Sequence, residues 1–136
     1  MSHLFQVSAK DHSAVVFMSV LADASSETWL SLEDVAKMMH LSHGYLEHVA
    51  GDLKAAGLII GRPGPRGGYR LAQAPERISL EDILVAVNGP VELVECQGSS
   101  SVCPVADHCS SRKVWGGVQQ AIRVALQQTT LAANKP

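Results

Sequence analysis

The spacing of hydrophobic positions over residues 8–57 predicts three helices, each preceded by a serine. Ser8, Ser31 and Ser42 stand at the starts, where a serine side chain can accept a hydrogen bond from a free backbone N–H of the first turn. The apolar residues after Ser31 and Ser42 recur at intervals of three and four, which is typical of a helix with one buried face. Residues 14–22 are apolar almost all round, so the first helix is expected to be buried on several sides.

A hairpin is predicted directly after the third helix, which ends before Gly57. Leu58–Ile60 and Tyr69–Leu71 have the composition of two short paired strands. The residues between them, 61–68, consist only of glycine, proline and arginine. The second and third helices, joined by a short turn, outline a helix-turn-helix, and a helix-turn-helix followed by a hairpin with a basic tip is a winged helix.

Two further helices are predicted in the second half of the chain. One begins at Ser79 and ends at Gly89-Pro90, and a long amphipathic helix begins near Ser111. The polar segment between them, residues 91–110, contains all three cysteines. The predicted fold class is mainly α with a small β-hairpin wing, that is, a winged helix-turn-helix plus a long C-terminal helix. The predicted segments are the winged helix at 1–74, the connecting helix and cysteine segment at 75–110, and the last helix and tail at 111–136.

Composition excludes several classes of protein. Hydrophobic residues make up 46% of the chain and charged residues 18%, which is ordinary for a globular protein and excludes a disordered one. No stretch approaches the roughly 18 consecutive apolar residues of a membrane span, and the N-terminus lacks the basic start and apolar run of a secretory signal. We therefore expect a cytoplasmic protein without a membrane partner. No nucleophile–base pair or phosphate loop can be assembled from the motifs, so no enzyme is expected.

The charge distribution points to nucleic acid more strongly than the total charge does. The net charge of −2 argues mildly against DNA binding. Residues 54–70, however, contain four basic side chains and no acidic one. Arg62 and Arg66 gain nothing for folding at the tip of a loop, whereas DNA phosphates would give them partners. The alternative is an ordinary surface turn.

The third helix is the predicted recognition helix, whose first residues would face base edges in the major groove. The candidate contacts are His43, Gly44, Tyr45, Glu47 and His48. Glu47 can accept a hydrogen bond from a cytosine amino group. Tyr45 also lies on the apolar stripe and is alternatively a core residue.

The cysteines form a candidate metal or redox site. Six residues separate Cys96 from Cys103, and five separate Cys103 from Cys109. Cytosolic thiols rarely form structural disulfides, and three is an odd number. Zinc sites prefer closer pairs, whereas iron–sulfur clusters tolerate wider spacing because the cluster spans the gap between ligands. Spacing alone leaves zinc and an iron–sulfur cluster both open.

Several motifs match one known family. They are Leu46-Glu47, Ala56-Gly57-Leu58, Gly64-Pro65-Arg66-Gly67-Gly68-Tyr69, Ile78-Ser79-Leu80, Trp115 and Thr130-Leu131. Together with the three cysteines, they resemble the iron–sulfur-responsive winged-helix repressors of the IscR and NsrR type from about residue 5 to residue 132. The resemblance implies a homodimer whose long last helices pair, a palindromic double-stranded operator, and a cluster bound by Cys96, Cys103 and Cys109. A 2Fe–2S cluster is expected in preference to 4Fe–4S.

The chain departs from the family pattern at three places. Pro63 stands where family wings carry an arginine, and the arginine here comes one position earlier, at Arg62. The gap between the first two cysteines is one residue longer than is usual in the family. Arg112 stands where IscR-like members have a histidine that serves as a cluster ligand. Other members take the fourth ligand from the partner's first helix, which implies His12. The competing ligands are His108, Asp11, Asp107 and water.

The predicted function is therefore a DNA-binding transcription regulator, a repressor, that senses redox state, nitric oxide or iron through its cluster. Two alternatives stay open. In one, the cysteine segment is a zinc site or a thiol switch on a protein that still binds DNA. In the other, the protein has kept the fold, lost its DNA affinity and acts as a protein–protein adaptor.

Overall fold

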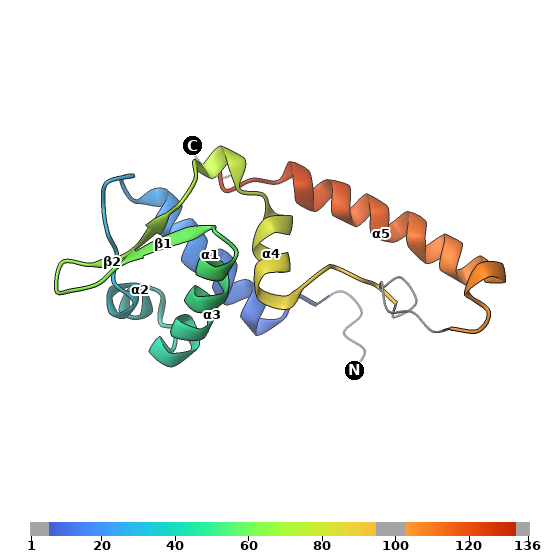
Figure 1. Cartoon of the computed structure of the whole chain (residues 1–136), viewed down its shortest axis with the longest axis horizontal. Helices are drawn as coiled ribbons and strands as arrows, with labels where there is room; N and C mark the ends of the chain where they lie inside the picture. The colour runs from blue at the N-terminus through green and yellow to red at the C-terminus, as the bar shows by residue number, and fades with distance from the viewer. Residues whose placement is uncertain (1–5, 95–102, 133–136) are drawn as a thin grey trace.

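The computed structural model describes residues 6–94 and 103–132 (Figure 1). The chain forms five α-helices, two 3₁₀ helices and a two-stranded hairpin within these residues. The first three helices are α1 (Ala9–Asp23), α2 (Leu32–Met39) and α3 (His43–Ala55). Among the described helices, none has the length and hydropathy that crossing a bilayer requires.

The predicted helix starts are confirmed. The hydroxyls of Ser8, Ser31 and Ser42 each accept a hydrogen bond from the backbone N–H three residues later. His40 ends α2 in the left-handed conformation, with φ of 55°. The short turn that follows brings α2 against α3, which completes the helix-turn-helix.

The core is mainly aliphatic and lies between α1, α3 and α4 (Leu80–Asn88), the helix that follows the hairpin. Its fully buried large side chains are Phe17, Met18, Val35, Leu46, Val49, Leu53, Ile59, Ile78 and Ile83. Phe17 also meets Tyr69 of the hairpin edge-on, with 6.2 Å between ring centroids. The hairpin is therefore packed onto the helices at its base.

The strands are β1 (Ile59–Arg62) and β2 (Gly68–Leu71). β1 runs two residues beyond the predicted Ile60, because Gly61 and Arg62 still pair with β2. On its other edge β2 is joined to Leu30, whose backbone N–H and C=O bond to Tyr69 at 3.0 and 2.8 Å. The segment between α1 and α2 is thus tied to the wing by backbone hydrogen bonds.

The glycine pair of the wing motif has a steric cause. A Cβ on Gly67 would lie 1.9 Å from the carbonyl oxygen of Arg62, and one on Gly68 would lie 2.3 Å from that of Leu30. Gly68 also has a φ of 143°, which side chains strongly disfavour. The backbone of Arg62 lies so close to Gly67, and that of Leu30 so close to Gly68, that neither position has room for a side chain.

Replacing Gly68 with alanine is therefore expected to lower the free energy of unfolding by about 2–3 kcal/mol, through the clash with Leu30 and the disfavoured backbone conformation. Denaturant unfolding followed by circular dichroism measures the change. Gly51→Ala is the matched control, because a Cβ there meets nothing within 4 Å, and its helical position predicts a gain of up to about 1 kcal/mol. Equal stability of the Gly68→Ala and wild-type proteins would contradict the steric explanation.

The helix after the hairpin begins as predicted at Ser79, which forms a capping box with Asp82. Two short 3₁₀ helices were not expected: η1 (Pro75–Arg77) and η3 (Ala106–His108). The long last helix, α5 (Ser110–Gln128), starts one residue before the predicted position.

Within residues 6–94 and 103–132, the bonds between α5 and the core lie at the C-terminal end of the helix. Glu81 of α4 bonds to Arg123 and Gln127, and the backbone beyond α5 pairs with Ile78 and Leu80. The first half of α5 extends away from the other helices (Figure 1). The cysteine end of α5 and the tip of the wing consequently lie at opposite ends of the molecule.

Candidate nucleic-acid interface and cysteine segment

α3 presents its first turns to solvent. Leu46, Val49, Ala50 and Leu53 are buried on one face. The predicted base-contacting residues His43, Tyr45, Glu47 and His48 are all exposed on the rest of the helix. Tyr45 is 37% exposed, so its alternative assignment to the core was wrong.

The two arginines predicted at the tip of the wing, Arg62 and Arg66, occupy different positions in the hairpin. Arg66 is exposed in the turn at the tip. Arg62, expected at the tip as well, is the last residue of β1, and its Nη2 donates to the carbonyl oxygen of Arg66 at 2.6 Å. Its guanidinium also lies 4.7 Å from the ring centroid of Trp29. The expectation that Arg62 gains nothing for folding was therefore wrong, since it helps to close the wing.

Positive charge on the wing is not neutralised within the described part of the chain. The ion pairs there join Lys10 to Asp52, Lys37 to Glu33 and Arg123 to Glu81. None involves an arginine of the hairpin, and residues 53–75 contain no acidic side chain. The wing therefore offers its charge to an external anion.

The structure describes two of the three cysteines, because Cys96 lies outside the described residues. Cys103 is exposed, Cys109 is half-buried at the N-cap of α5, and both are free thiols. Within residues 6–94 and 103–132, no three histidine, cysteine or acidic side chains gather closely enough to hold a metal ion. The three-cysteine site thus stays a prediction.

The two candidate histidine ligands lie on different elements, His12 in α1 and His108 in η3. His108 is exposed in η3, beside Cys109. His12 is exposed in the first turn of α1 and lines an open, mainly apolar groove of about 510 Å³ with residues of α1 and α2, Met38 and Met39 among them. Neither histidine belongs to a metal-binding group within the described residues.

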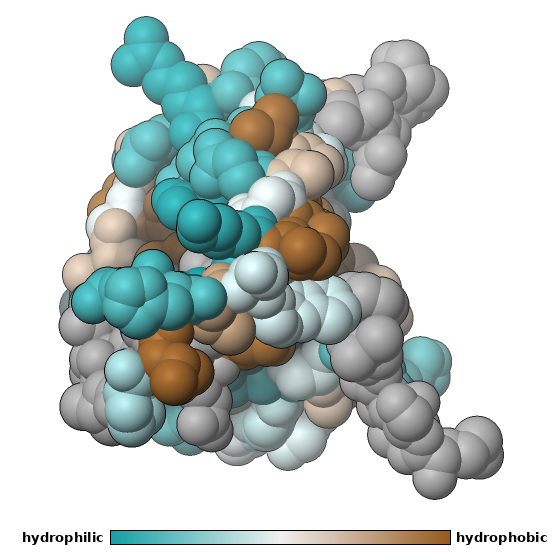
Figure 2. Space-filling model, turned by 90° about the vertical axis from the view of Figure 1, so that its right-hand side faces the viewer, coloured by the Kyte–Doolittle hydropathy of each residue, from teal (hydrophilic) through white to brown (hydrophobic). Residues whose placement is uncertain are grey.

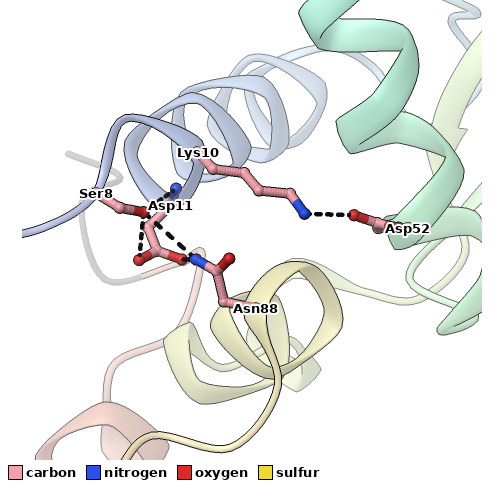
Figure 3. A network of polar contacts seen from close by, with 5 residues as sticks. All are labelled: Ser8, Lys10, Asp11, Asp52 and Asn88. Carbon is pink, nitrogen blue, oxygen red and sulfur yellow. Dashed lines mark hydrogen bonds and ion pairs between the residues drawn. The ribbon is translucent and has the colours of Figure 1, made fainter.

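A polar network joins the start of α1 to the end of α4, where the cysteine segment begins (Figure 3). Asn88 donates through Nδ2 to Asp11 and, at 3.4 Å, to Ser8. Beside them, Lys10 pairs with Asp52 of α3 at 3.0 Å. Side chains near the start of α1 thus contact both the helix before the cysteines and the candidate recognition helix.

The apolar stripe of α5 has few partners within the described chain. No residue of α5 is buried, and Val114 and Val118 are 65% and 39% exposed. Figure 2 looks onto the end where α5 begins, and apolar groups (brown) are exposed there between polar ones. An amphipathic helix with an uncovered apolar face is typical of a helix that packs against another chain.

Sequence reasoning missed three residues of these sites: Trp29, Arg70 and Asn88. Arg70 also stacks on Trp29, with 4.3 Å from its guanidinium to the ring centroid. The absence of acidic residues from 53–75 was the available signal for Arg70. No local pattern marks Trp29 or Asn88, whose partners are distant in the sequence.

Comparison with known proteins identifies the family. A family model described as "Rrf2: Iron-dependent Transcriptional regulator" matches residues 7–133. Protein rrf2 of Nitratidesulfovibrio vulgaris is 34% identical over 112 residues, which cover 82% of this chain and 75% of that protein. The structure of CymR, the global cysteine regulator of B. subtilis, aligns with a TM-score of 0.78 at 30% identity over 95% of each chain. The structure of T. potens IscR aligns with a TM-score of 0.76 at 32% identity, over 95% of this chain and 85% of that one. The chain therefore belongs to the Rrf2 family of winged-helix, DNA-binding transcriptional regulators, which are not enzymes.

Proposed function

We propose that this regulator is a cytoplasmic, homodimeric repressor that binds a palindromic operator and senses redox state, nitric oxide or iron through an iron–sulfur cluster. The observation that carries the DNA-binding part is the wing, whose arginines have no acidic partner within the described residues. α3, which belongs to the same winged helix as the wing, exposes the residues of its first turns to solvent. A helix for base edges and a basic hairpin for phosphates are the two parts of a winged-helix interface.

DNA affinity and its salt dependence test the interface. Each phosphate contact contributes about 0.9 to the slope of log K against log salt. Arg62 and Arg66 are assigned to phosphates, so alanine at either is expected to reduce the slope by about 1. Arg77→Ala is the control, because Arg77 is exposed in η1 outside the wing. Absence of salt-dependent binding by the wild-type protein would favour the adaptor alternative.

Glu47 is assigned to base reading together with His43, Tyr45 and His48. Glu47→Ala is expected to change the preferred base at one operator position by about 1–3 kcal/mol while leaving non-specific affinity nearly intact, because a carboxylate accepts from a base but repels phosphate. Binding to a set of single-base operator variants measures this. A uniform loss across all sequences would show that Glu47 acts on the fold instead.

The homodimer is proposed from the exposed stripe of α5. Pairing with α5 of a second copy would cover Val114, Trp115 and Val118. Two copies related by a two-fold axis would present two recognition helices to two half-sites, which is why a palindromic operator is proposed.

The donor set of the cysteine segment fits an iron–sulfur cluster. Cys103 and Cys109 are free and flank the single turn of η3, and Cys96 precedes them by a few residues. The Cys109 side chain makes no capping hydrogen bond at the start of α5, and the positive end of the helix dipole there favours an anionic ligand. When bound, a cluster, with 2Fe–2S expected before 4Fe–4S, supplies a charged centre whose state or loss signals the environment.

His12 is proposed as the fourth ligand, reaching the cluster of the opposite subunit. Its exposure in the first turn of α1 leaves the imidazole available to a partner. Asp11 is a weaker candidate, because its carboxylate is already engaged by Ser8 and Asn88. His108 and Asp107, both exposed in η3 directly before Cys109, are the competing candidates for the fourth ligand.

A thiol switch or a zinc site is the second candidate for sensing. The exposure of Cys103 as a free thiol favours it, and CymR of B. subtilis is a cysteine regulator. Visible absorbance and iron content after anaerobic purification distinguish the cases, because zinc and thiols are colourless.

We also propose that the network at the start of α1 carries the signal. Asn88 is the last residue of α4, the helix that leads into the cysteine segment, and it contacts Asp11 and Ser8. Lys10 pairs with Asp52 of α3. A change in the cysteine segment that moves the end of α4 would thereby shift α1 and α3 together. This arrangement supports a direct connection between sensor and DNA-binding helix within one subunit.

A further inference from the structure

Trp29 lies where the wing meets the helix-turn-helix. It precedes Leu30, whose backbone exchanges two hydrogen bonds with Tyr69 of β2. Because these bonds join backbone atoms, they hold residue 29 beside the hairpin whatever its side chain is. The indole is half-buried there.

Two arginines from neighbouring strands stack on this one indole. Arg62 lies 4.7 Å and Arg70 4.3 Å from the ring centroid, within the range of a cation–π contact. Ile60 pairs with Arg70 and Arg62 pairs with Gly68, so the two arginines are diagonal neighbours on one face of the hairpin. Trp29 is thus shared by the basic side chains of both strands.

The contacts orient the two guanidinium groups without neutralising them. Neither arginine forms an ion pair within the described chain. Both donate hydrogen bonds to backbone carbonyls within the described residues: Arg62 to that of Arg66, and Arg70 to that of Ser26 at 3.4 Å. A carboxylate would orient an arginine equally well but would cancel its charge, whereas an aromatic ring leaves the charge available. Two like charges brought to one ring repel each other until an anion approaches, and DNA phosphates are the anions that a wing meets.

We propose that Trp29 is a positioning residue for DNA binding, and that its indole holds Arg62 and Arg70 on one face of the hairpin so that both contact the phosphate backbone. The proposal rests on the proposed DNA interface. It adds Arg70 as a phosphate contact and explains why an aromatic residue precedes Leu30.

The test measures binding to a fluorescent random-sequence duplex of about 30 base pairs, roughly three helical turns, because phosphate contacts do not depend on sequence. Trp29→Leu keeps apolar bulk but removes the ring, and it is expected to weaken binding about threefold to tenfold. Trp29→Phe keeps a ring with a weaker attraction for cations and is expected to retain most of the affinity. Arg70→Ala is expected to reduce the salt slope by about 1, and Arg77→Ala is expected to leave it unchanged.

A double-mutant cycle separates positioning from a purely structural role. In a protein that already carries Arg62→Ala and Arg70→Ala, adding Trp29→Leu is expected to change the affinity no further. Thermal unfolding of each variant checks that the fold is intact. If Trp29→Leu does not fold, Trp29→Phe and Arg70→Ala carry the test.

Two outcomes separate this proposal from the proposed function. If the wild-type protein binds but Trp29→Leu binds equally well, or loses the same affinity with and without the arginines, the role of Trp29 is overturned while the DNA interface stands. If Arg70→Ala leaves the salt slope unchanged, Arg70 is not a phosphate contact, while the rest of the DNA interface stands. If the wild-type protein binds no duplex, both proposals are wrong.

Discussion

Replacing Cys103 with alanine is expected to abolish the visible absorbance of the anaerobically purified protein and to reduce its iron content to background. The side chain is exposed outside the core, so the winged helix should keep its secondary structure and its non-specific DNA affinity. Three thiolates supply most of the ligands of a four-ligand cluster, and removal of one leaves an iron site open to water. Absorbance, iron analysis and circular dichroism on the same sample measure the effect.

Ser110→Ala is the matched control, because it also removes one polar atom in the same stretch, at the start of α5, but no thiol. It should leave the absorbance unchanged.

The fourth ligand is examined by the same visible spectrum. His12→Ala should bleach or weaken the cluster absorbance, and His108→Ala should not. A full-intensity spectrum from Cys103→Ala would refute the three-cysteine site, and the reverse result for the two histidines would transfer the fourth ligand to His108.

If the proposed homodimer forms through α5, replacing Val118 with glutamate is expected to give monomers and to weaken operator binding by about 100-fold or more. Val118 lies on the exposed apolar stripe of α5, and pairing the helices would bury two unpaired carboxylates near the dimer axis. The loss of affinity follows because a linked second half-site typically contributes a factor of about 10²–10⁴. Sedimentation velocity gives the oligomeric state, and fluorescence anisotropy with a two-half-site duplex gives the affinity.

The control for charge is Gln120→Glu, on the opposite, polar side of α5, where the same added carboxylate stays in water. It should remain dimeric with nearly wild-type affinity. Val118→Glu should also bind a single half-site about as well as the wild-type protein does. A Val118→Glu protein that sediments as a dimer would show that α5 is not the dimer contact.

The local parts of the fold could be predicted from sequence because their causes are local. A serine followed by an apolar stripe specifies both the start and the buried face of a helix, and Ser8, Ser31, Ser42 and Ser79 all cap helices as expected. The glycine-rich wing was recognisable as well. The reason for its glycine pair emerged only with the backbone of Leu30 in place.

The contacts that link distant segments could not be predicted in the same way. Asn88 and Asp11 are 77 residues apart, and nothing in either local sequence indicates that the packing of α1 on α4 brings them together. Trp29 reaches Arg62 and Arg70 only because β2 takes Leu30 as a second neighbour. For the cysteine segment, sequence supplies the donor set, and Cys96 lies outside the described residues.

The proposal that an iron–sulfur cluster controls DNA binding is tested most directly by the Kd of the anaerobically purified protein for its operator, measured before and after a chelator removes the iron. The operator is first selected from a pool of random duplexes, and visible absorbance verifies the presence and the loss of the cluster. Typical coupling between two sites predicts a change in Kd of about 5-fold to 150-fold, with Cys103→Ala showing the iron-free value throughout. The same Kd with and without the cluster would contradict control by iron–sulfur chemistry.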